Sequence, residues 1–478
     1  MKIIFWPALF LLLFISKSTS AQQIQKHRLI VLSDIEAEVD DTESFIRLLL
    51  YSNDIDIEGL IATTSVWKKT SVSPEAIKKL IYAYGKVQPN LLKNEKGFPS
   101  ADALLTLVKQ GIPKYGMEGV GKGKDSQGSD WIIKVLEEKD ERPLWIAVWG
   151  GANTLAQALY KIKETKSPAE AKRLIGKLRV YTISDQDDSG IWMRNNFPDL
   201  FYIVSPGDDY GSATWTGINS FINGINNDEI SNTWLAKNIQ QGHGPLGAEY
   251  PDVAYGMEGD TPSWLSLIPN GLNDPEHPDW GGWGGRYELY KPDFSKEKKG
   301  SSGVPFEPET RAIWTNAIDN YSPYIFKEYG RTVEKDTTSF TGYKVTLWRW
   351  RNDFQNDFAA RMDWCTKSYK EANHPPVIIL SQPDNITVKS GQGFGLDASS
   401  SKDPDGDSIS FLWFEYPEAG SYKKPINMTA ENIHSIYAVA PEVEKKETIH
   451  IILKVTDKGT PALSSYKRII VTVLPKRL

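Results

Sequence analysis

The chain has 478 residues, 40% of them hydrophobic, which suffices for two or three globular domains and excludes a wholly disordered protein. Its formal net charge of −6, with no long basic block, disfavours nucleic acid and anionic membranes as partners. The single cysteine, Cys365, excludes an internal disulfide, so the fold must depend on its hydrophobic cores.

Residues 1–21 are typical of a secretory leader. A charged start precedes an apolar run over residues 3–15, and small residues at positions 18–21 form a cleavage region. No later stretch approaches the roughly 20 apolar residues of a membrane span. We therefore expect an exported protein, periplasmic or secreted, without a membrane partner.

The stretch LIVLSDIEAEVDD, from Leu29 to Asp41, combines an apolar strand with a dense acidic run. Five carboxylates fall within eight residues, namely Asp34, Glu36, Glu38, Asp40 and Asp41. Each unpaired buried carboxylate is costly, so a cation should compensate them, and Ca²⁺ is bound by oxygen ligands alone. Alternatively, the last acids only begin the helix predicted over residues 42–52, where the helix dipole favours negative charge.

Strands and helices alternate over the next part of the chain. The hydrophobic patterns predict strands at 29–33, 57–63, 144–149, 179–184 and 200–205. They predict helices at 42–52, from Pro74 onward, and at 129–139, 153–164 and 168–175. This alternation indicates an α/β domain with a mostly parallel sheet and flanking helices, whose site lies at the carboxyl ends of the strands. Polar segments follow two further strands there, WGGAN at 149–153 and DQDD at 185–188.

The following region is less regular. Residues 233–241 have helical spacing, and GGWGG places Trp280 and Trp283 in a glycine-rich loop. We expect this loop to be an exposed shelf for sugars, in preference to a hydrophobic plug. Helices predicted over 310–327 and 352–371 would close a domain that spans residues 27–371.

A second domain is predicted after His374-Pro375-Pro376, over residues 375–478. Short β-branched runs such as ITVKSG and IIVTVL, separated by turns, indicate a small all-β immunoglobulin-like sandwich. The stretch ASSSKDPDGDSISFLWFEY resembles the polycystic-kidney-disease (PKD) type of immunoglobulin-like module, with Trp413 in its core.

The first strand, its acidic run and the following helix resemble the N-terminal signature of inosine-uridine nucleoside hydrolases. In that family, spaced acids hold a Ca²⁺ ion that orients the attacking water. Asp34, Glu36, Asp40 and Asp41 occupy the acidic positions here, and WGGANTLAQAL resembles the segment that supplies a carbonyl ligand, at Asn153. One departure is Glu36, which stands where those enzymes have an Asp that is both ligand and presumed base.

Two longer stretches, DIEAEVDDTESFIRLLLYSNDIDIEGLIATTSVW and VYTISDQDDSGIWMRNNFPDLFYIVSP, look like a secreted bacterial family with a nucleoside-hydrolase-like domain. Some of its members are described as cellulose-binding. The resemblance covers most of residues 27–370. It implies a Ca²⁺-assisted hydrolase of an N- or O-glycosidic bond, with a carbohydrate or nucleoside as substrate.

The resemblance also implies roles for individual residues. The metal ligands would come from Asp34, Glu36, Asp41, Asn153 and Asp260, with Glu258 as the alternative to Asp260. Asp40 or Glu36 would act as the base. The chain has no clear counterpart of the late His-Asp pair of those enzymes, so His243 or His277 stands in as the acid for the leaving group, and an ordinary loop histidine is the first interpretation of His243. The substrate-binding candidates are Trp149, Asn153, Asp187, Asp188, Trp192, Arg194, Asn195, Asn196, Trp215 and Glu258.

A different function class remains open, in which the hydrolase-like domain has lost its chemistry and binds a polysaccharide such as cellulose. Glu36 favours this alternative, because its extra methylene displaces the carboxylate. The retention of five acids favours hydrolysis. A phosphatase of the haloacid dehalogenase type is excluded, since Glu36 replaces the second Asp of that signature. The sequence leaves the oligomeric state open, and a homodimer is compatible with it.

Overall fold

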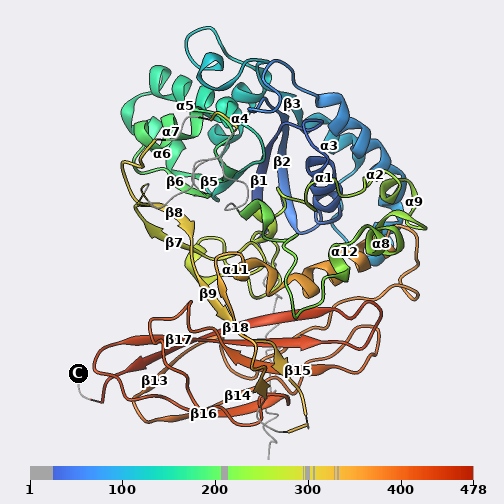
Figure 1. Ribbon diagram of the computed structural model, residues 1–478, viewed down its shortest axis with the longest axis vertical. Helices are drawn as coiled ribbons and strands as arrows, with labels where there is room; N and C mark the ends of the chain where they lie inside the picture. Colours follow the sequence, from blue (N-terminus) through green and yellow to red (C-terminus); the bar gives the residue numbers. More distant parts are fainter. Residues whose placement is uncertain are drawn as a thin grey trace, which may run out of the picture.

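The computed structural model describes residues 25–205, 214–293, 295, 302–304, 307–327, 329–330 and 333–476. The predicted leader, residues 1–21, lies outside the described residues. Figure 1 shows an α/β part stacked on a β-rich C-terminal part, drawn in orange and red. Across the described ranges, no helix has the length and apolar character needed to cross a membrane.

The α/β part is built on one eight-stranded sheet. Its strand order is β3-β2-β1-β4-β5-β6-β8-β7, and all neighbours are parallel except the antiparallel pair β7 and β8. The strands are β1 (His27–Ser33), β2 (Ile55–Ala62), β3 (Val108–Gln110), β4 (Leu144–Val148), β5 (Leu178–Ser184), β6 (Phe201–Ser205), β7 (Tyr287–Tyr290) and β8 (Ile313–Asn316). The predicted mostly parallel sheet is therefore confirmed, and β1 lies near its centre.

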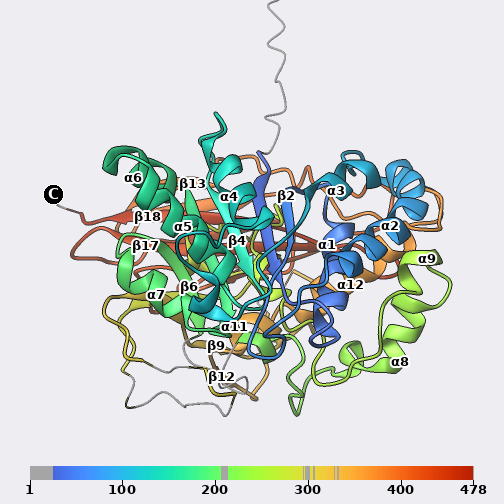
Figure 2. The ribbon, with the colours of Figure 1, turned by 90° about the horizontal axis from the view of Figure 1, so that it is seen from above.

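Helices cover both faces of this sheet (Figure 2). Alternate residues of β1 enter two apolar clusters: Leu29 and Val31 pack with α1 and α2, whereas Ile30 and Leu32 pack with α4 and α5. The main helices are α1 (Asp40–Leu50), α2 (Pro74–Asn94), α3 (Ala101–Leu107), α4 (Gln127–Glu137), α5 (Asn153–Thr165), α6 (Pro168–Gly176), α7 (Ser189–Asn196) and α12 (Arg351–Asp363). Burial on both faces explains why the strands read as continuous apolar runs.

Short elements connect the sheet to the C-terminal part. They are α8 (Asn232–Leu235), α9 (Gly244–Gly247), α10 (Pro262–Leu265), α11 (Val345–Trp348), β9 (Asp319–Tyr321), β10 (Tyr324–Ile325), β11 (Glu334–Lys335) and β12 (Phe340–Gly342). The helix predicted over 310–327 is wrong, because this segment forms β8, β9 and β10. In β8 the buried and half-buried residues alternate with the period of a strand, and Pro323 cannot donate a helical hydrogen bond.

The C-terminal part is the predicted all-β sandwich. One sheet has the order β13-β18-β17-β15, and a second consists of β14 and β16. The strands are β13 (Asn385–Lys389), β14 (Gly393–Asp397), β15 (Ser410–Glu415), β16 (Ser435–Val439), β17 (Glu447–Thr456) and β18 (Ser464–Leu474). Trp413 is buried in the core between the two sheets, as predicted.

The two parts meet over a large contact that includes the GGWGG loop. Trp283 is buried, and Trp280 stacks on His277 with ring centroids 3.9 Å apart and lies edge-on to His450 of β17. Both indoles therefore pack in or beside the junction. The expected sugar shelf is wrong, since the sandwich covers this loop.

Buried polar contacts also join the two parts. Asp353 of α12 accepts hydrogen bonds from Lys454 of β17 and Tyr466 of β18. Arg468 of β18 donates to the carbonyl oxygens of Leu272 (2.9 Å) and Gly281 (2.8 Å). These contacts satisfy groups that would otherwise be buried without partners, so they fix one docked orientation.

His450 makes the stability of this junction depend on pH. Burial, and then the charge of Arg468, lower the pKa of His450 to about 3. The folded protein keeps this imidazole neutral, whereas the unfolded chain binds a proton below about pH 6.5. Above about pH 6.5, His450 therefore does not lower the unfolding free energy. As the pH falls below 6.5, the unfolding free energy decreases by about 1.4 kcal/mol per pH unit.

We predict that His450→Gln flattens the decline in unfolding free energy between pH 7 and pH 4, because the amide still accepts from Arg468 but does not titrate. Urea unfolding at the two pH values measures this difference. His434→Gln, at a half-exposed position, is the control and should keep the wild-type slope. A slope unchanged in His450→Gln would contradict the assignment.

Candidate functional site

A cluster of carboxylates lies at the carboxyl end of β1. Asp34 directly follows β1, Asp40 and Asp41 begin α1, and Asp260 comes from the loop before α10. Carboxylate oxygens of Asp40, Asp41 and Asp260 lie within 4.8 Å of one another, and Asp34 lines the same pocket. The sheet thus brings together residues separated by more than 200 positions in the chain.

Neighbouring groups hold these carboxylates in place. Trp215 Nε1 donates to Asp40 Oδ2 at 2.6 Å, and Ser33 Oγ donates to Asp41. Asp34 lies against Gly150, where a Cβ atom would be 2.6 Å from Asp34 Oδ1. The glycine after β4 is therefore required by the close approach of the acid after β1.

The electrostatics of the cluster are unfavourable without a cation. Burial, followed by the charges of the other acids, raises the pKa of Asp41 and of Asp260 well above its usual range, and burial raises the pKa of Asp34. Burial and the charge of Glu38 raise the pKa of Asp40 to about 7. No ion pair between described residues includes a carboxylate of this cluster. The site is therefore suited to a positive ion.

The pocket around the cluster is narrow, with a cavity volume of about 10 Å³. Besides acids, it is lined by Trp67, Trp149, Trp215 and Gln186. Trp67 is 50% exposed, whereas Trp149 is buried and donates to Ser263. Gln186 donates to the carbonyl oxygen of Trp149, and its own Oε1 is buried without a partner in the described structure. An orphaned acceptor beside four carboxylates is a further oxygen ligand for a hard cation.

Two predicted acidic ligands do not join the cluster. Glu36 has a φ of 74°, and its exposed carboxylate faces Lys68 (3.4 Å) and Ser73, whose hydrogen bond lowers the pKa of Glu36. Glu258 forms a buried ion pair with Arg47 at 2.5 Å. The structure places Asp260, rather than Glu258, among the clustered acids, and it turns the predicted base Glu36 outward.

The residues after β4 and β5 mainly support the loops around the site. The side chain of Asn153 donates to the carbonyl oxygen of Lys114 (2.6 Å) and accepts from Thr63 (3.0 Å). Asp187 accepts from the backbone N–H groups of Asn153 and Ser189, and burial raises its pKa to about 6. Asp188 accepts from the Met117 backbone. None of these three side chains lines the acid pocket.

The remaining candidates also lie outside the pocket lining. Arg194 is buried between Asp185 and Glu309. Trp192 packs edge-on to Phe197, Asn195 accepts from Thr310, Asn196 donates to the Trp192 carbonyl oxygen, and His243 contacts Asp363 of α12 at 3.1 Å. Each of these side chains has a partner within the fold.

Sequence reasoning missed two residues of the pocket lining, Trp67 and Gln186. Trp67 follows β2 in the segment ATTSVW, and Gln186 stands in DQDD after β5. Each residue follows the carboxyl end of a strand, β2 or β5, that neighbours the central pair β1 and β4. Sites of parallel sheets lie at these strand ends, so this position could have identified both residues.

Comparisons with known proteins add two family matches. A family model described as "Cellulose-binding Sde182, nucleoside hydrolase-like domain" matches residues 28–287. A second, described as "Cellulose-binding protein Sde0182, C-terminal domain", matches residues 393–473. No curated protein matches the chain.

One similar solved structure is a nucleoside hydrolase-related hypothetical protein from Saccharophagus degradans that is associated with carbohydrate metabolism. It is 34% identical and superposes with a TM-score of 0.79, covering 94% of this chain and 100% of that one. The nucleoside-hydrolase-like fold predicted for the α/β part is thereby confirmed.

Two shorter solved structures each cover 21% of this chain. A PKD domain from the KIAA 1837 protein is 20% identical over 88% of its own length, with a TM-score of 0.17. A C. elegans MSP family member is 9% identical over 97% of its length, with a TM-score of 0.14. Because both TM-scores are low, the resemblance of the sandwich to a PKD module stays a prediction.

We predict that Gly150→Ala destabilises the protein by about 1–3 kcal/mol, because the new methyl group would overlap Asp34. Urea unfolding measures the change. Gly176→Ala is the matched control, since a Cβ there meets no atom within 4 Å and should leave stability nearly unchanged. Equal stability of the two variants would refute the close contact between Gly150 and Asp34.

Proposed function

Because the chain belongs to the family of nucleoside hydrolase-like, cellulose-binding Sde182 proteins, we propose that it is an exported carbohydrate-active hydrolase. In this proposal, the acid pocket would hold a Ca²⁺ ion that positions a water, and that water would cleave an N- or O-glycosidic bond. The substrate is a plant or environmental carbohydrate or a nucleoside. The export signal would be the leader in residues 1–21.

The observation that carries the proposal is the set of four buried carboxylates, Asp34, Asp40, Asp41 and Asp260, which form no ion pair within the described part of the chain. Asp34, Asp41 and Asp260 would hold the ion, with the orphaned Oε1 of Gln186 beside them. All these donors are oxygens, which fits Ca²⁺. When bound, Ca²⁺ supplies a positive charge that orients water and favours its deprotonation.

The chain's own residues would perform the remaining steps. Asp40, which lies beside the proposed ligands and whose carboxylate faces the same pocket, accepts the proton of the attacking water. Trp215 Nε1 fixes the orientation of Asp40 through its hydrogen bond to Oδ2. Trp67 and Trp215 flank the pocket and offer rings on which a sugar can stack. The water attacks an anomeric carbon with oxocarbenium character, the glycosidic bond breaks, and the leaving group departs with the bonding electron pair and takes up a proton from solvent.

A second candidate function is polysaccharide binding without catalysis, with cellulose as the ligand. The family description favours it, and so does one structural observation. Glu36, at the position of the related enzymes' presumed base, forms an ion pair with Lys68 outside the pocket. In this alternative, the acid cluster would hold Ca²⁺ for structural reasons only.

We predict that Asp40→Asn lowers kcat by about 10²- to 10⁴-fold while Ca²⁺ binding persists, because it removes the base but not the proposed ligands. Asp41→Asn should weaken Ca²⁺ binding itself. Calorimetry with Ca²⁺, and sugar release from nucleosides, aryl furanosides and plant oligosaccharides, measure both effects. Glu75→Gln, an exposed change on α2, is the control.

If Asp40→Asn keeps the wild-type rate and Glu36→Gln loses it, the base is Glu36 and not Asp40. If neither chelator nor any acid variant changes sugar release, the hydrolase proposal is wrong.

The binding alternative predicts a different outcome for the wild-type protein. It should sediment with insoluble cellulose, release no sugar from any member of the substrate panel, and remain bound when a chelator removes Ca²⁺. Depletion of protein from the supernatant measures binding. Sugar release that the chelator abolishes would contradict this alternative.

A further inference from the structure

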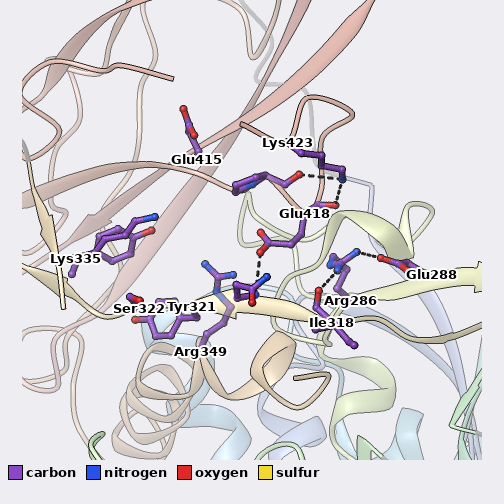
Figure 3. Close-up of a pocket in the computed structure, with 13 residues that line it drawn as sticks. Arg286, Glu288, Ile318, Tyr321, Ser322, Lys335, Arg349, Glu415, Glu418 and Lys423 are labelled. Atoms are coloured by element: carbon purple, nitrogen blue, oxygen red, sulfur yellow. Dashed lines mark hydrogen bonds and ion pairs between the residues drawn. The ribbon is translucent and has the colours of Figure 1, made fainter. Parts of the chain in front are cut away.

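A second and larger hollow lies at the junction of the two parts (Figure 3). One wall is formed by residues 318–324, which carry β9 and the start of β10, together with Lys335 of β11. The opposite wall is the sandwich segment 415–423, after β15. The hollow has a volume of about 430 Å³, compared with about 10 Å³ for the acid pocket, and the two share no lining residue. Ligand sites are common at such domain junctions.

The floor of the hollow is a fixed guanidinium group. The side chain of Arg349 is buried, donates to Asp319 Oδ2 at 3.1 Å, and stacks on the rings of Tyr321 and Tyr416. Its Nε is buried and has no hydrogen-bond partner among the described residues. Because a buried, unpaired donor is costly, this group points to a ligand or water that accepts from it.

The charges around the hollow are balanced. Four cationic side chains line it, namely Arg286, Lys335, Arg349 and Lys423, and three acidic ones, namely Glu288, Glu415 and Glu418. The buried Asp319 pairs with both arginines and provides a fourth negative charge. An anionic ligand would meet as much repulsion as attraction. A neutral ligand with many hydroxyl groups can use both the donors and the acceptors.

Another hollow lies beside this junction hollow. It is lined on one side by Tyr321 and Tyr324, which it shares with the first, and by the more apolar side chains of Phe326, Phe411 and Leu412. Its volume is about 640 Å³, and Phe326 is 56% exposed. Together, the two hollows form a junction groove in which aromatic rings alternate with polar groups.

We propose that the junction groove binds a neutral glucan chain and is a carbohydrate site separate from the acid pocket. The inference rests on the proposed carbohydrate function and assigns where a polymer is held. The acid pocket has room only for a small part of such a chain, whereas the groove accommodates several sugar units. The exposed ring of Phe326 stacks on sugar faces, and the rim residues Lys335 and Glu418 contact hydroxyl groups.

The test measures the binding of cellohexaose by calorimetry and of insoluble cellulose by depletion, using the full chain. Phe326→Ala combined with Lys335→Ala should weaken both by at least tenfold. Tyr437→Ala combined with Lys445→Ala is the matched control, because these exposed residues line neither hollow. The control pair should bind as the wild type does. Unfolding temperatures verify that both double variants are folded.

Asp41→Asn separates this inference from the proposed hydrolysis, because it should leave glucan binding unchanged. Full glucan binding by the Phe326/Lys335 variant, or its loss in Asp41→Asn alone, overturns the groove and leaves the hydrolase proposal in place. Binding of carboxymethylcellulose but not of cellohexaose overturns the neutral ligand. If the wild type neither binds nor cleaves any saccharide, the proposed function fails, and the groove assignment fails with it.

Discussion

The repulsion among buried carboxylates at the end of β1 is the constraint on which the site depends. A strand buried on both faces delivers Asp34 into the interior, and the first turn of α1 adds Asp40 and Asp41 from the same short loop. Asp260 reaches them from the far side of the domain. Such a group is tolerable in a folded protein only when a cation or protons neutralise it, so local structure and ion binding are coupled.

At the junction between the α/β part and the sandwich, buried charged side chains are paired with other residues of the protein. Asp319 accepts from Arg286, Arg349 and Tyr416, and Asp353 accepts from Lys454 and Tyr466. This difference distinguishes charged residues that stabilise the fold from charged residues that are available to bind a ligand. Acids with arginine or lysine partners hold the fold together, whereas Asp34, Asp40, Asp41 and Asp260 form no ion pair with any described residue.

Much of the fold and part of the site could be predicted from the sequence. Apolar runs followed by polar segments located the strands of the sheet and the acids Asp34, Asp40 and Asp41 at their ends. The direction of a side chain was not accessible in this way. Glu36 stands in the same run, but its left-handed backbone turns it toward Lys68, a contact that spacing along the chain does not reveal. Likewise, the indoles of Trp280 and Trp283 resembled an exposed shelf because the sandwich that covers them lies far along the sequence.

The larger apolar cluster of the α/β part does not stop at the junction. It continues from Trp283 and Phe354 to Phe414, Tyr416 and Tyr466 of the sandwich. A shortened protein ending near His374 would expose these rings to water and leave Asp353 without its partners, which favours aggregation over independent folding. The C-terminal region thus completes the larger apolar core of the α/β part.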